Sequence, residues 1–110
     1  MNNKWHLPSK DVLNAMYENN IGKFVNEYYW SSTGFNSDFA WFQDMGNGYQ
    51  CISKKKYLTR FRAVRVLPED HSEKENVFKI DDVEYQAFYT DAPVRLSWKA
   101  AKKYCKGNNK

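Results

Sequence analysis

The stretch Tyr28-Tyr29-Trp30-Ser31-Ser32-Thr33 decides the fold, because three consecutive aromatic residues are followed by three small hydroxyl residues. Successive side chains of a strand point to opposite faces of a sheet. The three rings therefore cannot share one core: at least one must be buried, and another must face a second layer or solvent. The stretch predicts a core strand that runs into a turn. An exposed aromatic platform for a ligand is the alternative.

The composition favours one domain with a β-rich, aromatic-packed interior, since 17% of the 110 residues are Phe, Trp or Tyr. Seventeen basic and thirteen acidic residues give a net charge of +4. The excess lies in residues 1–66, with nine basic against five acidic groups; residues 67–110 carry eight of each. This balance is too mild to indicate a nucleic-acid partner, and we do not expect one.

Three further features concern the compartment. Cys51 and Cys105 can form one bridge or none. No segment approaches the ~18 apolar residues that a membrane span requires. The first residues, Met1-Asn2-Asn3-Lys4-Trp5, contain no apolar core of a signal peptide. We therefore expect synthesis in the cytoplasm without a secretory signal, and release, if any, in a particle set free by lysis.

Two amphipathic helices are predicted. The first covers residues 9–20, with Ser9 as its cap, Asp11 in its first turn and an apolar stripe facing the core. The second begins after Ser97 and ends at Gly107. Its apolar face consists of Trp98, Ala101, Tyr104 and Cys105, and its opposite face of Lys99, Lys102, Lys103 and Lys106.

The strands are predicted at residues 24–30, 40–45, 49–53, 59–66, 77–80 and 83–88, with a polar loop at 31–38. Asn47-Gly48 predicts a type I′ hairpin turn, and Asp81-Asp82 a second hairpin. Residues 67–76 form a charged linker. The single domain 1–110 thus divides into a motif-bearing part (1–66), this linker, and a hairpin plus helix (77–110).

Five motifs follow one another along the chain: Trp5-His6-Leu7-Pro8-Ser9, Tyr29-Trp30-Ser31-Ser32-Thr33, Ala40-Trp41, Asn47-Gly48 and Arg62-Ala63-Val64-Arg65. Their order resembles the Lcl C-terminal domain family, which has a C-type-lectin-like fold related to formylglycine-generating enzymes. The match covers about residues 4–66. It implies an α+β module with two short helices packed on small antiparallel sheets, displayed for binding rather than catalysis. The structural motif residues that carry it, together with one from the last helix, are Trp5, Leu7, Pro8, Trp30, Ser31, Ser32, Trp41, Arg62, Arg65 and Trp98.

The last helix occupies a different place along the chain from the corresponding helix of the family. It resembles the family's first helix, which normally precedes the Trp-x-Leu-Pro motif, and Asn-Asn-Lys occurs at both ends of this chain. The resemblance implies a circularly permuted fold, or a helix swapped onto the next subunit of a homo-oligomer. An ordinary core helix is the alternative.

The resemblance also sharpens two expectations about single residues. We expect Trp30 to be buried as a scaffold residue, with Ser31–Thr33 satisfied by backbone groups. In some relatives a cysteine at the position of Ala63 pairs with the one at Cys105. Because residue 63 is alanine here, a free, buried Cys105 is expected.

We predict no catalytic residue, no metal site and no cofactor. His6 and His71 have no nucleophile or carboxylate at a recognisable spacing. Calcium needs clustered oxygen ligands, and Asp38, Asp44 and Asn47 are too scattered in the sequence. Asp44 and Asn47 are better explained as turn residues.

One basic-aromatic group is a candidate binding site for sulfated glycans, nucleic acid or acidic protein: Tyr49, Lys54, Lys55, Lys56, Tyr57 and Arg60. The alternative is a solvated lysine turn that protects an edge strand. Taken with the missing signal peptide, the small size and the permuted termini, the resemblance implies a non-catalytic binding or structural module on a phage virion surface, with a decoration or host-attachment role and other virion proteins as partners. A carbohydrate-binding adhesin module of a bacterial surface is the second hypothesis, and an enzyme of the formylglycine-generating type the third.

Overall fold

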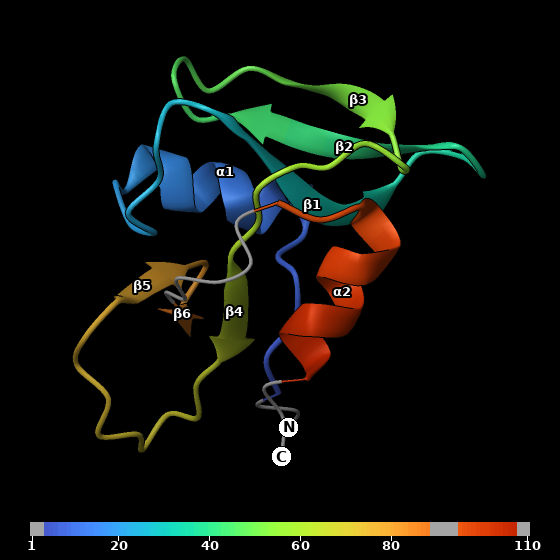
Figure 1. Ribbon diagram of the computed structural model, residues 1–110. Coiled ribbons are helices and arrows are strands. Elements are labelled where there is room, and N and C mark those ends of the chain that lie inside the picture. Colours follow the sequence, from blue (N-terminus) through green and yellow to red (C-terminus); the bar gives the residue numbers. More distant parts are fainter. Residues whose placement is uncertain (1–3, 89–94, 108–110) are drawn as a thin grey trace.

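A computed structural model describes residues 4–88 and 95–107, which form the predicted α+β fold of two short helices and two small antiparallel sheets (Figure 1). One sheet has the order β1-β2-β3 and the other β4-β6-β5. The elements are α1 (Lys10–Glu18), β1 (Tyr28–Gly34), β2 (Phe39–Asp44), β3 (Gln50–Lys54), β4 (Ala63–Val66), β5 (Val77–Ile80), β6 (Val83–Phe88) and α2 (Trp98–Lys106).

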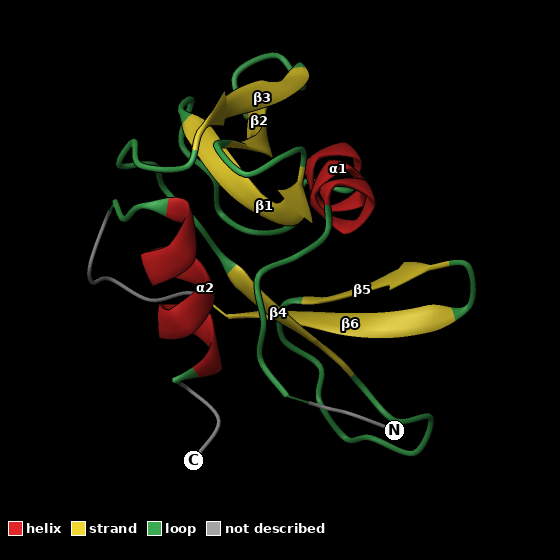
Figure 2. Ribbon diagram, turned by 90° about the vertical axis from the view of Figure 1, so that its right-hand side faces the viewer, coloured by secondary structure: helices red, strands yellow, loops and turns green. Residues whose placement is uncertain are grey.

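Helix α1 lies between the two sheets (Figure 2). Ser9 is its N-cap, and the Ser9 hydroxyl accepts a hydrogen bond from the Val12 N–H at 3.2 Å. Leu13 and Met16 have no exposed surface. They share one apolar cluster with residues of both sheets, among them Tyr29, Met45, Val64 and Phe78. Helix α1 therefore contacts both sheets and links them through this cluster.

Helix α2 packs on the face of the β1-β2-β3 sheet that α1 leaves open (Figure 1). The Tyr104 ring lies 5.5 Å from the Phe61 ring, and Leu7 belongs to the same cluster. The Trp98 indole donates to the Ser31 carbonyl at 2.8 Å. The helix is therefore docked on its own chain. The repeated Asn-Asn-Lys, on which part of the permutation hypothesis rests, lies outside the described residues except for Lys4.

Strand β1 begins and ends later than predicted, so both the strand at 24–30 and the loop at 31–38 were misplaced. Ser31 is buried within the strand, and its hydroxyl donates to the Trp41 carbonyl at 2.7 Å. The Thr33 hydroxyl accepts from the Lys10 N–H at 3.0 Å. The pairing of β1 with β2 is irregular between Trp30 and Gly34, and these hydroxyls form hydrogen bonds where the ladder is interrupted. The expectations that Trp30 is buried and that Ser31 and Thr33 bond backbone groups are confirmed.

The strand predicted at 59–66 is also shorter, because the chain crosses between sheets there. Thr59 and Arg60 form single bridges, to Leu96 and Tyr29 respectively. From Ala63 onward the chain pairs with β6. Arg62 lies at the crossing and donates to the Gly22 carbonyl at 2.9 Å.

The type I′ turn predicted at Asn47-Gly48 is wrong, whereas the second predicted hairpin is correct. Only Gly48 has a positive φ, of 82°, and its N–H bonds the Asp44 carbonyl. The loop is longer because it buries Met45. In the other hairpin Asp81 and Asp82 have φ values of 48° and 67°, as a two-residue type I′ turn requires.

The charged segment 67–76 connects two strands of the same sheet and is attached to it. The His71 and Glu84 side chains approach to 2.8 Å, and the Gln86 amide donates to Glu73 at 3.1 Å. Within the part of the chain that the structure describes, no helix is long and apolar enough to cross a bilayer.

Candidate functional site

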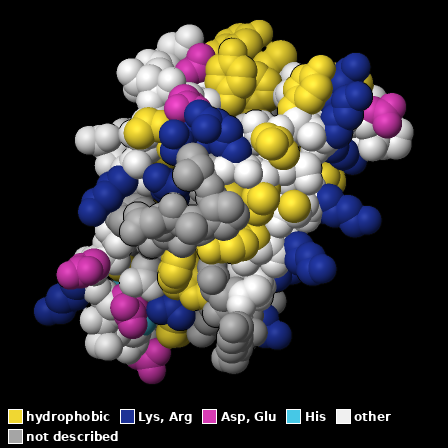
Figure 3. All heavy atoms as spheres, in the orientation of Figure 1, with side chains coloured by type: hydrophobic (Ala, Val, Ile, Leu, Met, Phe, Trp, Pro, Cys, Tyr) yellow, Lys and Arg dark blue, Asp and Glu magenta, His cyan; other side chains and the backbone are white. Residues whose placement is uncertain are grey.

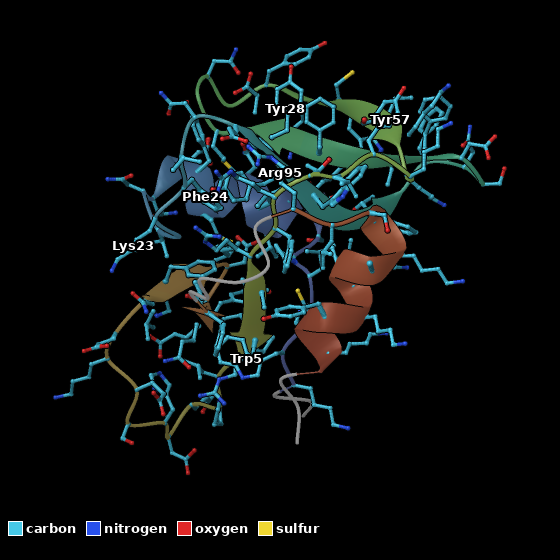
Figure 4. The ribbon with its side chains drawn as sticks, in the orientation of Figure 1. Trp5, Lys23, Phe24, Tyr28, Tyr57 and Arg95 are labelled. Atoms are coloured by element: carbon cyan, nitrogen blue, oxygen red, sulfur yellow. The ribbon has the colours of Figure 1, made fainter. Side chains whose placement is uncertain are left out.

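The structure divides the six predicted binding residues among three places. Tyr49 precedes β3 and Lys54 ends it, so the two lie at opposite ends of the strand. Arg60 is elsewhere, with its Nε 3.1 Å from Glu27 Oε1, although this contact lacks the alignment of a hydrogen bond. Lys54 stays together with Lys55, Lys56 and Tyr57 of the turn that follows β3, and the Tyr57 N–H donates to the Lys54 carbonyl. Figure 4 labels Tyr57 in this turn.

That turn meets α2 at Trp98. The ammonium of Lys55 lies 4.4 Å from the centre of the Trp98 ring, and that of Lys102 lies 3.6 Å from it. The ring is fixed because its N–H is bonded to Ser31, and the Trp98 backbone N–H donates to the Lys55 carbonyl at 2.9 Å. We call Trp98 with Lys55, Lys99, Lys102 and Lys106 the lysine surface.

The lysines of this surface carry charges of one sign and take part in none of the ion pairs found among the described residues. Partial burial lowers the pKa of Lys102, and the positive charges of Lys106, Lys55 and Lys99 lower it further. The ion pairs found among the described residues join other groups: Arg60 and Arg95 to Glu27, Arg65 to Glu73, and His71 to Glu84. In the space-filling view, dark blue side chains run down the side that α2 occupies (Figure 3).

Three hollows lie outside this surface or at its border. One of about 320 Å³ adjoins the lysine turn and is lined by Ser37, Asp38, Phe39 and Lys54–56. One of about 290 Å³ lies beside Tyr28, Leu58 and Arg95. The largest, of about 800 Å³, is lined by Trp5, Arg65, Gln86 and neighbouring residues.

Most of the predicted structural motif residues form the scaffold. Leu7, Pro8, Trp30 and Ser31 are buried, and the Ser32 N–H donates to the Pro8 carbonyl at 2.7 Å. Trp41 lies under the ammonium of Lys10, at 4.7 Å. Three motif residues stand next to candidate sites instead: Trp98 in the lysine surface, and Trp5 and Arg65 in the largest of these hollows.

The cysteines are both free, and the prediction of a free, buried Cys105 is confirmed. Burial raises the pKa of the Cys105 thiol to about 12, so it is protonated at neutral pH and a poor nucleophile. Ala63 lies in the same cluster as Cys105. Among the described residues no three His, Cys, Asp or Glu side chains are grouped so that they could hold a metal ion.

Sequence reasoning missed the part that α2 plays in the site. Lys99, Lys102 and Lys106 were recognised as one helix face, but nothing in the pattern places that face beside Lys55, which is 44 residues from Lys99. The signal available was the predicted apolar face, since docking it on the core turns the lysines outward.

Comparisons with family models, with curated proteins and with solved structures find no match for this chain. The class that the structure defines is a compact α+β domain.

Proposed function

We propose that this chain is a non-catalytic binding module that holds an anionic partner against the lysine surface. The observation that supports it is the pair of ammonium groups, of Lys55 and Lys102, over one fixed indole ring, with the charges of Lys99 and Lys106 close enough to act on Lys102. Like charges at this spacing repel one another, and a bound anion relieves that repulsion. The indole adds a flat apolar contact at the centre of the charged area.

The lysine surface is tested by elution from immobilised heparin, used as a polyanion probe. Replacing Lys102 and Lys106 by Gln lowers the salt concentration at which the protein elutes, because two ammonium groups are lost from the site. A matched control replaces Lys74 and Lys79, which are exposed and lie away from α2. Equal shifts for both pairs would mean that only net charge matters, and would refute the site.

The fold within this proposal is a circularly permuted C-type-lectin-like domain. The support is the resemblance of residues 4–66 together with the docking of α2 on its own chain beside Leu7 and Ser31. A chain that starts at Ser72, continues from Lys110 through a Gly-Ser linker to Met1 and ends at His71 is then expected to fold. Opening β6 between Tyr85 and Gln86 is the control that abolishes folding. Unfolding of the first permutant would contradict the proposal.

The setting we propose is the surface of a phage virion, where the module assembles with other virion proteins or with copies of itself. This part depends on the resemblance alone. Particles released by lysis of cells that produce the chain, labelled with an antibody against it and gold, should carry the label. Label confined to the soluble fraction would refute virion display and leave the binding proposal standing.

The alternative is a carbohydrate-binding adhesin module. A glycan array compares the chain with a variant in which Lys54, Lys55 and Lys56 are Ala. Glycan binding that disappears in the variant favours an adhesin acting through the lysine turn. The absence of any bound glycan removes this alternative.

A further inference from the structure

The largest hollow has a composition unlike that of the lysine surface, and the proposed function does not use it. It lies on the face of the β4-β6-β5 sheet that carries the pairs Arg65–Gln86 and Ala63–Phe88, next to the apolar cluster in which Ala63 is buried. The other face, with Val64 and Ala87, packs towards α1. The volume of about 800 Å³ is within the range of small-ligand sites. We call it the Trp5 hollow; Figure 4 shows Trp5 beside β4.

The polar groups of the Trp5 hollow are held in place by one another. The Arg65 guanidinium lies 4.7 Å from the centre of the Trp5 ring, and its Nε donates to Gln86 Oε1 at 2.9 Å. The amide nitrogen of Gln86 donates to Glu73 Oε1 at 3.1 Å. Phe88 meets Trp5 edge to face at 5.0 Å. This network orders the side chains before any ligand arrives, which lowers the entropic cost of binding.

The charges that line the Trp5 hollow cancel. Lys23 and Arg65 are positive, and Glu73 and Glu75 are negative. A strongly charged ligand therefore gains little from the hollow as a whole, in contrast to the lysine surface. Its guanidinium, amides and carboxylates offer donors and acceptors together, which is the chemistry that recognises neighbouring hydroxyl groups.

We infer that the Trp5 hollow is a binding site for a neutral saccharide. The sugar hydroxyls exchange hydrogen bonds with Arg65, Gln86 and Glu73, which supply the polar lining, while Trp5 holds Arg65 in place at the border of the hollow. The inference does not depend on the lysine surface or on virion display. It places saccharide binding on the β4-β6-β5 sheet instead of at the lysine turn.

The test is a titration of isotope-labelled protein, followed by NMR, with four neutral probes: maltotriose, cellotriose, chitotriose and mannotriose. At least one probe shifts the Trp5 indole and Gln86 side-chain amide signals. Gln86→Ala weakens binding about tenfold, because it removes both the ligand contact and the support of Arg65. Lys79→Ala is the matched control, since it changes an exposed residue of β5 on the same sheet that does not line the hollow.

Three results overturn the inference. The first is no shift of the Trp5 and Gln86 signals with any probe up to about 10 mM, a concentration that reveals millimolar affinity. The second is equal affinity of the wild type and Gln86→Ala, and the third is loss of binding in the Lys102→Gln, Lys106→Gln variant, which would place the sugar on the lysine surface. Thermal unfolding checks the fold of Gln86→Ala. If that variant unfolds, the inference stands or falls on whether the NMR signals that shift in the wild-type protein belong to residues of the Trp5 hollow.

Discussion

The two helices have the same length of nine residues but opposite surroundings. Helix α1 packs against both sheets and buries the large side chains of Leu13 and Met16. Helix α2 is covered on one side only, and the residues that it buries fully are the small Ala101 and Cys105. Small side chains let α2 approach β1 closely, and its uncovered side carries the lysines. Helix α1 thus stabilises the fold, and the half-covered helix α2 presents a surface.

The two helices also differ in the capping interactions at their N-termini. Helix α1 has a bonded N-cap and an acidic residue, Asp11, in its first turn. Helix α2 has Ser97 at the N-cap without a side-chain hydrogen bond, and no acidic residue in its first turn. Lys103 and Lys106 in its last turn interact favourably with the helix dipole. Helix α2 therefore depends on packing for its stability more than on its caps.

The largest expected effect comes from removing the apolar anchor of helix α1. Leu13→Ala lowers the free energy of unfolding by about 2–5 kcal/mol, because it leaves a cavity between two sheets that cannot both collapse onto it. Urea unfolding measures the loss. The matched control is Val12→Ala, in which a half-buried residue is truncated and a clearly smaller loss is expected. Equal losses would show that α1 is not held between the sheets as described.

The second effect concerns the thiol that α2 buries. Because burial raises the pKa of Cys105 from 9.0 to about 12, the folded state keeps a proton that the unfolded state releases. This contribution to stability is complete below pH 9 and is lost as the pH rises towards 12, at roughly 1 kcal/mol per pH unit. Wild-type stability should therefore fall more steeply than that of Cys105→Ala between pH 9 and 11. Parallel pH profiles would contradict the assignment.

The sequence predicted the helices well because capping and the 3.6-residue period are local signals. It misplaced β1 because hydroxyl residues such as Ser31 usually mark a loop, whereas here they bond the neighbouring strand at an irregular register. It misread Asn47-Gly48 because the burial of Met45, a tertiary contact, sets the length of that loop.

The candidate sites were less predictable than the fold. The lysine turn was found because its residues are consecutive, but its union with α2 depends on how Trp98 docks. The Trp5 hollow combines Trp5 with residues of β4, β6 and the segment before β5, which the sequence separates by up to 83 positions (88 − 5). No local pattern predicts such a group, because the pairing of Arg65 with Gln86 creates it.

The hydroxyls of Ser9 and Ser97, at the N-termini of the two helices, should contribute unequally to stability. Ser9→Ala removes the hydrogen bond to the Val12 N–H and lowers the free energy of unfolding by about 1 kcal/mol. Ser97→Ala removes a hydroxyl that makes no capping bond, so its effect on stability is near zero. Thermal unfolding of both variants provides the comparison, and each serves as the control for the other. A larger loss for Ser97→Ala would show that its hydroxyl caps α2 in solution.

The smallest effect is expected at the centre of the lysine surface. Lys102→Gln removes a charge that partial burial disfavours and that three neighbouring lysines disfavour further, so stability rises by a few tenths of a kcal/mol at low salt. The gain shrinks at high salt, where the repulsion is screened. It also shrinks as the pH rises towards 10.5, because the lowered pKa means that the folded state releases this proton before the unfolded state does. Lys74→Gln, in an exposed loop, is the control with no such dependence. A salt-independent loss would instead mean that the Lys102 stem stabilises α2 through its contact with Trp98, and that the charges around the ring are not in conflict.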